Sequence, residues 1–310
     1  MIEQPIVLIL GAGASIPYGF PSGGKLKQVI LEALDPNKGT RFPSILNQLG
    51  VKSKIIKDYY HDLYFSGCSS VDAFLEHRPE FVEVGKLSIA ISLIPFEKDN
   101  FLFKAKNIDN SWCHFLFSKM KVDFNSFDKN RISIITFNYD RSIEHFLFTV
   151  LINSYGKSEE QCAEKIRNIP IIHVYGRLGA LPWQESQEIK KKYDEHIDYD
   201  SRNNLKIIYK LSEQINIISD DKLNISEFNT SFENMSSARY IYFLGFGYNE
   251  TNMKRLRIKD VKIKDPHQIR GTAFNLGQSE IAYIKGKLTI DLADSSYDCL
   301  AFMKNNFVIS

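Results

Sequence analysis

Three polar residues follow or interrupt apolar, strand-like segments of the chain, at positions where side chains can act on a bound ligand. Asn138 and Asp140 come directly after the run 132–136, and His173 lies in the run 169–174. An amide can hold a hydroxyl group or a water without adding charge, and a histidine that titrates near neutral pH can act as a general base. The structural alternatives are that Asp140 caps a helix, that Asn138 tolerates an awkward turn, and that His173 is a hydrogen-bonded core residue.

A tyrosine accompanies this histidine. Tyr175 stands two positions after His173 and directly before Gly176. Because side chains two apart in a strand point to the same face, His173 and Tyr175 are predicted to form a polar pair. In a parallel sheet that pair would lie where ligands bind.

Two glycine-rich turns also follow apolar runs. The first spans 11–15 and reads Gly-Ala-Gly-Ala-Ser, and the second spans 245–249 and reads Gly-Phe-Gly-Tyr-Asn. Glycine lets the backbone approach a pyrophosphate closely, and the helix after such a turn offers unpaired N–H groups. Either turn could instead serve packing, with Asn249, Glu250 or Thr251 capping the helix after the second. A dehydrogenase is disfavoured, because Ile16 replaces the third glycine of G-x-G-x-x-G and Asp35, the nearest acidic candidate for the ribose, looks like a helix stop.

A sheet must position these motifs. Apolar runs predict strands at 5–10, 132–136, 169–174, 240–245 and 272–274, and periodicity predicts helices at 26–34, 142–152 and 278–287. This alternation indicates an α/β fold, a Rossmann-like parallel sheet covered by helices on both faces. We expect one domain over 1–310, with a helical insertion at 35–127 in which Ser69-x-x-Asp72 resembles a capping box.

The bulk composition limits the classes of function. The 310 residues are 44% hydrophobic and 25% charged, which suffices for a large core, and no run approaches the roughly 20 apolar residues of a membrane span. Four separated cysteines without a C-x-x-C pair argue against disulfides and a zinc site, and favour a cytoplasmic protein without a metal. A net charge of +2 gives little attraction for nucleic acid. The basic run 254–264 is interpreted as a solvated face, with a partner contact as the alternative.

The order and spacing of the motifs resemble the sirtuin superfamily. That family opens with G-A-G-x-S, three residues and G-I-P-D-F-R, and this chain has Gly11-Ala12-Gly13-Ala14-Ser15, three residues and Gly19-Phe20-Pro21-Ser22-Gly23-Gly24. Its T-Q-N-I-D is similar to Thr136-Phe137-Asn138-Tyr139-Asp140. Its histidine–glycine strand end is similar to His173–Gly176, and its later G-T-S turn to Gly245-Phe246-Gly247.

The resemblance implies a set of site residues around NAD+. Asn138 and Asp140 would face the nicotinamide ribose, and His173 would accept a proton. The implied cofactor-binding residues are Gly11, Ala12, Gly13, Ser15, Pro21, Ser22, Tyr175, Gly245, Phe246, Gly247 and Asn249. The chain departs from the family in having Ser22-Gly23-Gly24 for Asp-Phe-Arg, Phe137 for glutamine, and Tyr175 where the histidine directly precedes the glycine. The family's zinc module is missing too, since no cysteine lies between Cys162 and Cys299.

These departures make the chain similar to the sirtuin-like NAD hydrolases of bacterial anti-phage defence. The predicted function is an NAD+ glycohydrolase that releases nicotinamide and ADP-ribose and depletes NAD+ during infection. The resemblance also implies a homo-oligomer and a HerA-type hexameric ATPase as partner. The alternatives are a catalytically silent sensor of NAD+ or ADP-ribose and, with less support, an NAD-dependent protein deacylase.

Overall fold

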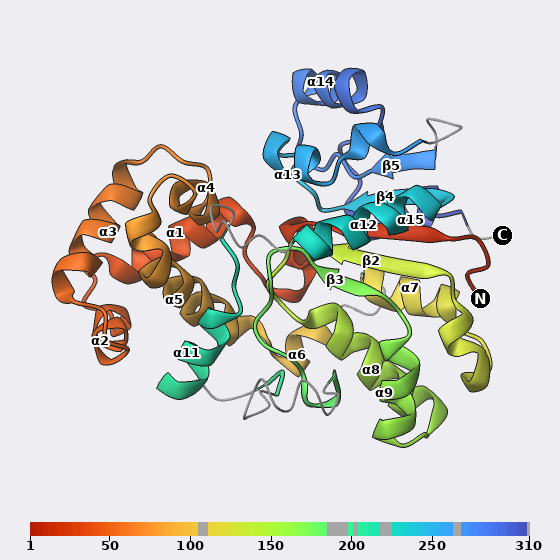
Figure 1. The fold of residues 1–310 in the computed structure, drawn as a ribbon, viewed down its shortest axis with the longest axis horizontal. Coiled ribbons are helices and arrows are strands. Elements are labelled where there is room, and N and C mark those ends of the chain that lie inside the picture. Colours follow the sequence, from red (N-terminus) through yellow and green to blue (C-terminus); the bar gives the residue numbers. More distant parts are fainter. Residues whose placement is uncertain (105–110, 185–197, 201–203, 218–224, 263–267, 309–310) are drawn as a thin grey trace.

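The computed structural model describes residues 1–104, 111–184, 198–200, 204–217, 225–262 and 268–308. Within these ranges six parallel strands form one sheet in the order β3-β2-β1-β4-β5-β6 (Figure 1). The strands are β1 (Ile6–Leu10), β2 (Ile132–Thr136), β3 (Ile171–His173), β4 (Tyr240–Leu244), β5 (Ile269–Gly271) and β6 (Asp291–Leu292). The predicted α/β, Rossmann-like fold is confirmed. Its strand order reverses between β1 and β4, and sheets of this kind bind ligands at that switch point.

The central strand β1 fixes the level at which its neighbours end. It consists of isoleucine, valine and leucine, all buried, as a strand covered on both faces requires. Leu10 lies opposite Thr136 of β2 and Leu244 of β4. The segments that begin at residues 11, 137 and 245 therefore leave the sheet side by side.

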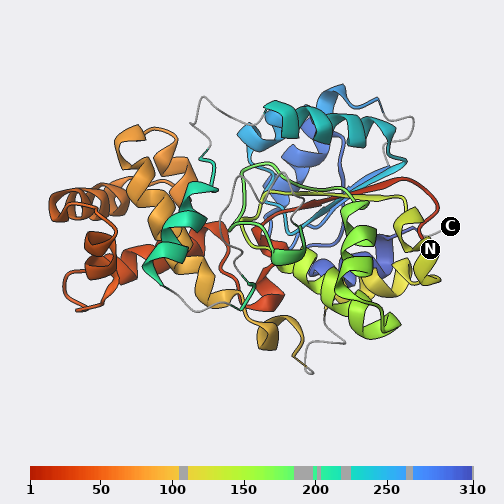
Figure 2. The same ribbon diagram turned by 60° about the horizontal axis from the view of Figure 1, so that its bottom comes forward.

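Helices cover both faces of the sheet (Figure 2). On one face α12 contacts β1 and β3, and on the other α7 contacts α8, which in turn contacts α9. The helices around the sheet are α6 (Asp99–Leu102), α7 (Trp112–Met120), α8 (Ser142–Tyr155), α9 (Glu159–Arg167), α12 (Ile225–Ser237), α13 (Glu250–Arg255), α14 (Gln278–Leu288) and α15 (Cys299–Asn306). No helix in the described ranges is both long enough and apolar enough to cross a bilayer.

A separate group of helices lies beyond the carboxyl ends of the strands (Figure 1). We call it the helical layer, and it comprises α1 (Gly23–Leu34), α2 (Phe42–Gln48), α3 (Ser53–Phe65), α4 (Val71–Leu75), α5 (Val82–Leu93) and α11 (Leu205–Glu213). Helix α5 is at its centre and contacts α1, α2, α3, α4 and α11. The candidate residues at the carboxyl edge of the sheet consequently face this layer.

The structure corrects three local predictions. The fifth strand is Ile269–Gly271 rather than 272–274. Ser70, not Ser69, caps α4, and Asp72 instead accepts a hydrogen bond from the Tyr139 hydroxyl at 2.6 Å. The helix predicted at 26–34 is α1, Gly23–Leu34, but two 3₁₀ turns separate it from the first glycine turn, to which it was expected to offer its unpaired N–H groups. Its positive end is thus not at that turn.

Candidate functional site

The two glycine turns touch each other backbone to backbone. A Cβ atom on Gly11 would lie 2.6 Å from the Gly245 carbonyl oxygen, and one on Gly13 would lie 2.7 Å from the Gly245 Cα. Gly245 itself has a φ of +57°, in the left-handed region that favours glycine. We call this contact between residues 11–13 and residue 245 the glycine seam. It brings the loops after β1 and β4 together at the switch point of the sheet.

Part of the backbone predicted to bind phosphate, in the turns 11–15 and 245–249, is already hydrogen-bonded within the seam. The Gly11 N–H donates to the Leu244 carbonyl at 3.0 Å, and the Gly13 N–H donates to the Gly245 carbonyl at 2.9 Å. Across the described ranges, the N–H groups of Ala12, Phe246 and Gly247 donate to no other part of the chain. These three are among the donors of the two turns that an anion can use without breaking a backbone hydrogen bond.

Asn138 is held directly against the seam. Its Nδ2 donates to the Gly11 carbonyl and to Ser15 Oγ, both at 3.0 Å. Because a carbonyl can only accept, this contact fixes which end of the amide faces the seam. Asn138 Oδ1 receives no hydrogen bond from the described residues, so it is the acceptor that remains for a ligand hydroxyl or a water.

Ser15 links this amide to a buried carboxylate. Its hydroxyl donates to Asp140 Oδ2 at 2.7 Å, while the Ser142 N–H donates to Asp140 Oδ1 at 3.2 Å. Burial raises the pKa of Asp140, although the hydrogen bonds from Ser142 and Ser15 oppose the rise. Asp140 is therefore more basic than an exposed aspartate and is joined to Asn138 through one hydroxyl.

Both ring nitrogens of His173 are engaged. Nδ1 lies 3.0 Å from the Asn138 carbonyl oxygen, and Nε2 lies 2.6 Å from Oε1 of Glu144, which is fully buried in α8. Arg177 Nη1 lies 3.6 Å from the same carboxylate oxygen. Burial acts to raise the pKa of Glu144, but the charge and hydrogen bond of His173, together with Arg177, lower it to about 2.

This geometry leaves His173 without the free lone pair that the predicted proton-accepting role requires. His173 and Tyr175 also do not form the predicted polar pair. The strand ends at His173, so the two-residue alternation does not extend to Tyr175, whose hydroxyl donates to Asn252 Oδ1 at 2.7 Å and accepts from Arg255 Nη1 at 2.9 Å.

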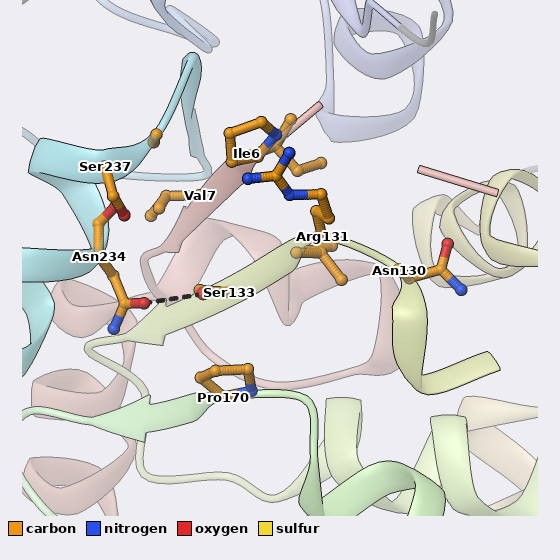
Figure 3. Close-up of a pocket in the computed structure, with 11 residues that line it drawn as sticks. Ile6, Val7, Asn130, Arg131, Ser133, Pro170, Asn234 and Ser237 are labelled. Carbon is orange, nitrogen blue, oxygen red and sulfur yellow. Dashed lines mark hydrogen bonds between the residues drawn. The ribbon is translucent and has the colours of Figure 1, made fainter. Parts of the chain in front are cut away.

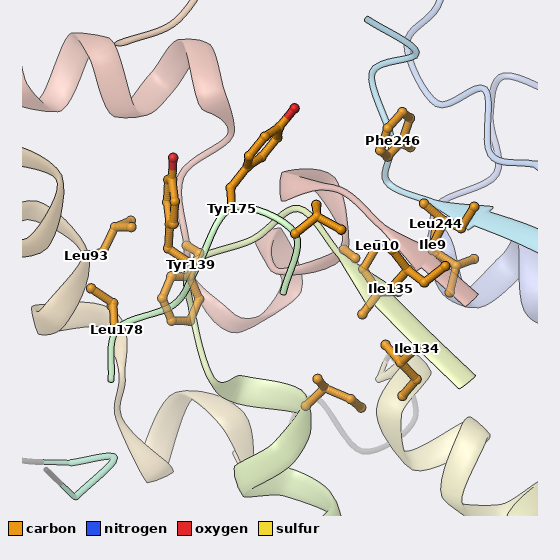
Figure 4. Close-up of a cluster of buried hydrophobic side chains, with 14 of the residues drawn as sticks. Ile9, Leu10, Leu93, Ile134, Ile135, Tyr139, Tyr175, Leu178, Leu244 and Phe246 are labelled. Carbon is orange, nitrogen blue, oxygen red and sulfur yellow. The ribbon is translucent and has the colours of Figure 1, made fainter. Parts of the chain in front are cut away.

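An aromatic cluster borders the site. The Phe137 ring packs edge-on against Tyr175 and Phe246, with centroids 5.4 and 4.9 Å away. Figure 4 shows Tyr175 above the carboxyl end of β2 and Phe246 beyond the end of β4. Phe137 thus supplies apolar surface between the two predicted halves of the ligand site.

The remaining predicted residues have local structural roles. Asn249, one of the three cap candidates in the sequence, caps α13 and accepts from the Thr251 N–H at 2.9 Å. Ser22 caps α1, accepting from Lys25 N–H at 3.3 Å, and Pro21 precedes this cap.

Sequence reasoning missed Glu144. One signal was available, because Asp140, Glu144, Leu147 and Leu151 recur at helical spacing, which places a carboxylate on the buried face of α8. Its pairing with His173 was not available, since the two residues are 29 positions apart.

A hollow lies at the opposite edge of the sheet (Figure 3). It has a volume of about 210 Å³ and is lined by the first residues of β1 and β2, by Arg131 directly before β2, and by the end of α12, including Asn234 and Ser237. Ser133 Oγ donates to Asn234 Oδ1 across it at 3.1 Å. Because it lies at the amino ends of the strands, it is separate from the candidate site.

No family model matches the chain, and no curated protein matches it. Direct contacts run from Gly245 to Gly11, from Gly11 to Asn138 and from Asn138 to His173. The four predicted motifs accordingly meet at one place.

Proposed function

We propose that the protein binds NAD+ at the carboxyl edge of its sheet and hydrolyses the nicotinamide–ribose bond, which yields nicotinamide and ADP-ribose. The observation that carries this proposal is the unbroken series of contacts from Gly245 through Gly11 and Asn138 to His173. A dinucleotide needs a phosphate site next to a ribose site, and this series places the glycine turns against the amide.

The open N–H groups of Ala12, Phe246 and Gly247 are the proposed donors to the pyrophosphate. They lie at the switch point between β1 and β4, where doubly wound sheets bind dinucleotides. A Cβ on Gly247 would meet no atom within 4 Å, so packing does not account for a glycine at that position. Close approach of a ligand would account for it.

Asn138 and the carboxylate behind it are the proposed chemical groups. Nicotinamide leaves as a neutral molecule from a cationic glycoside, so the reaction needs a well-aimed water more than a strong acid. Asn138 Oδ1 would hold that water or a ribose hydroxyl. The water's proton would pass to Ser15 Oγ as the Ser15 proton moves to Asp140, whose raised pKa makes it the better acceptor.

A second candidate function is binding of NAD+ or ADP-ribose without turnover. The observation that favours it is the engagement of both His173 ring nitrogens, which leaves no imidazole base in this arrangement. In either case the biological setting suggested by the sirtuin-like motifs is bacterial anti-phage defence in the cytoplasm, with homo-oligomers or a HerA-type ATPase as the assemblies to test.

The deciding experiment is an assay of nicotinamide release from NAD+, performed on the protein alone and in each assembly. We expect release by the wild type and a loss of about 100-fold or more in kcat for Asn138→Ala, because the group that orients the nucleophile is removed. Asn305→Ala, an exposed asparagine on α15, is the matched control and should equal the wild type. NAD+ binding without release would establish the sensor function, and neither binding nor release would overturn both.

A further inference from the structure

Resting on the proposed function, we infer that His173 is a positioning residue: a buried imidazolium, clamped by Glu144, that fixes the backbone of Asn138 and takes no proton during the reaction. This assigns the histidine of the site a role that differs from general base catalysis.

The hydrogen bond at Nδ1 shows that this nitrogen carries a proton. Nδ1 lies 3.0 Å from the carbonyl oxygen of Asn138, and a carbonyl offers no proton, so Nδ1 must be the donor. The imidazole is buried, with its side chain 5% exposed, so no solvent water needs to be invoked at this nitrogen.

The surroundings of the hydrogen bond at Nε2 decide whether the ring carries a second proton. Nε2 and Glu144 Oε1 are 2.6 Å apart, so one proton lies between them. The other groups facing this pair are Arg177, which is 3.6 Å from Glu144 Oε1, and Asp140, whose negative charge interacts with that of Glu144. The adjacent guanidinium stabilises the carboxylate form of Glu144, which places the proton on the ring.

The clamp acts on the site through the main chain. The imidazolium holds the Asn138 carbonyl on one side, and Asp72 of the helical layer holds the next side chain, Tyr139, on the other. Between these anchors the Asn138 side chain reaches the Gly11 carbonyl and Ser15. Losing the clamp would let the Asn138 amide shift slightly. Because this amide orients the attacking water, the shift affects turnover more than ligand binding.

The first test is an NMR spectrum of the ¹⁵N-histidine-labelled protein. We expect both His173 nitrogens to show the imidazolium signature at pH 7, and that signature to disappear in Glu144→Gln. The signals missing from His173→Asn assign the resonances. His61, which pairs with Asp62 on the surface, is the solvent-exposed comparison in the same spectrum. A neutral His173 ring at pH 7 would overturn the inference.

The second test compares two substitutions of His173 in the release assay. Asparagine offers an N–H donor near the Nδ1 position but no base, whereas alanine offers neither. We expect His173→Asn to retain kcat within about 10-fold of the wild type and His173→Ala to lose about 100-fold, both with little change in NAD+ affinity. Equal losses in the two variants, or a limb of the pH–rate profile that vanishes in His173→Asn, would indicate a general base and overturn the inference.

The two tests separate the possible failures. The spectrum requires no turnover, so an imidazolium in a protein that releases no nicotinamide would leave the clamp standing and remove the proposed hydrolysis. Nicotinamide release by a protein with a neutral His173 would refute the clamp and leave the proposed hydrolysis standing. Urea unfolding of each variant verifies that a loss of turnover does not arise from a loss of folded protein.

Discussion

At the scale of single residues, the glycines of the two turns are of two kinds. Gly11, Gly13 and Gly245 lack side chains because main-chain atoms occupy the space that a Cβ would need. Gly247 borders open space, so its lack of a side chain has no packing explanation. A packing role and a ligand role can therefore be separated by substitution.

Gly13→Ala and Gly247→Ala form a matched pair for this purpose. We expect Gly13→Ala to lower the free energy of unfolding by about 1–3 kcal/mol, because the added methyl group meets the Gly245 backbone. We expect Gly247→Ala to leave stability unchanged and to weaken NAD+ binding about tenfold, or about 1.4 kcal/mol. Urea unfolding and calorimetric titration measure the two effects. Unchanged NAD+ affinity in Gly247→Ala would place the pyrophosphate elsewhere.

At the scale of elements, the strands β1, β2 and β4 were predictable because each is an uninterrupted apolar run, although the predictions for β1 and β4 each extended one residue too far. Strand β5 was misplaced because its three residues, Ile-Arg-Gly, carry no strand pattern. The segment at 272–274 has that pattern, but it is not part of the strand. The Thr272 hydroxyl accepts a hydrogen bond from the Gly245 N–H, and the Thr272 N–H donates to the Phe243 carbonyl. One of these hydrogen bonds extends the pairing with β4, and the other holds the glycine turn.

The site was predictable to a similar extent. Its four motifs could be identified from residue types and local spacing, and the order of the strands explains why they meet. The engagement of His173 was not predictable, because it depends on how α8 packs against β3 and brings Glu144 to the imidazole. Contacts of this kind depend on tertiary packing, and neither periodicity nor motif spacing specifies them.

The bond between α8 and β3 predicts a pH dependence of stability. The pKa of Glu144 falls from an ordinary 4.5 to about 2 in the folded protein, so the folded state binds this proton less tightly than the unfolded chain. The carboxylate thus stabilises the fold at neutral pH, by about 3 kcal/mol, and this contribution is lost as the pH falls from about 4.5 to about 2.

The measurement is the difference in unfolding free energy between the wild type and Glu144→Gln as a function of pH. The difference should shrink through that acidic window. The raised pKa values of Asp140 and Glu97 make the fold more stable as the pH falls. Both residues are present in both proteins, so their contributions to the difference cancel to a first approximation. Glu164→Gln, on the surface of α9, should show no such dependence. A difference that stays constant down to pH 2 would contradict the ion pair.

At the scale of the whole molecule, the sheet and the helical layer share one core. The buried apolar side chains form a single cluster that extends from the strands into α3, α4 and α5. A buried ion pair reinforces this arrangement: Glu97, which follows α5, receives hydrogen bonds from the guanidinium and backbone N–H of Arg141, directly before α8. Both side chains are at most 1% exposed.

We therefore expect one cooperative unfolding transition by both near- and far-ultraviolet circular dichroism. Glu97→Gln should lower the stability of that single transition by about 3–5 kcal/mol, because the Arg141 charge stays buried without its partner. Asp58→Asn, which breaks the exposed pair with Lys54, should cost less than about 1 kcal/mol. Two separate transitions in the wild type would show that the layer and the sheet are independent units.

The glycine seam also bears on how variation among related sequences should be interpreted. At positions 11, 13 and 245 the obstructing neighbours include main-chain atoms, which no compensating mutation elsewhere can shorten. Selection for folding alone would hold these three positions fixed, even in descendants that had lost the ability to handle a nucleotide. Invariance at residue 247, where folding imposes no such limit, would instead indicate selection for ligand binding.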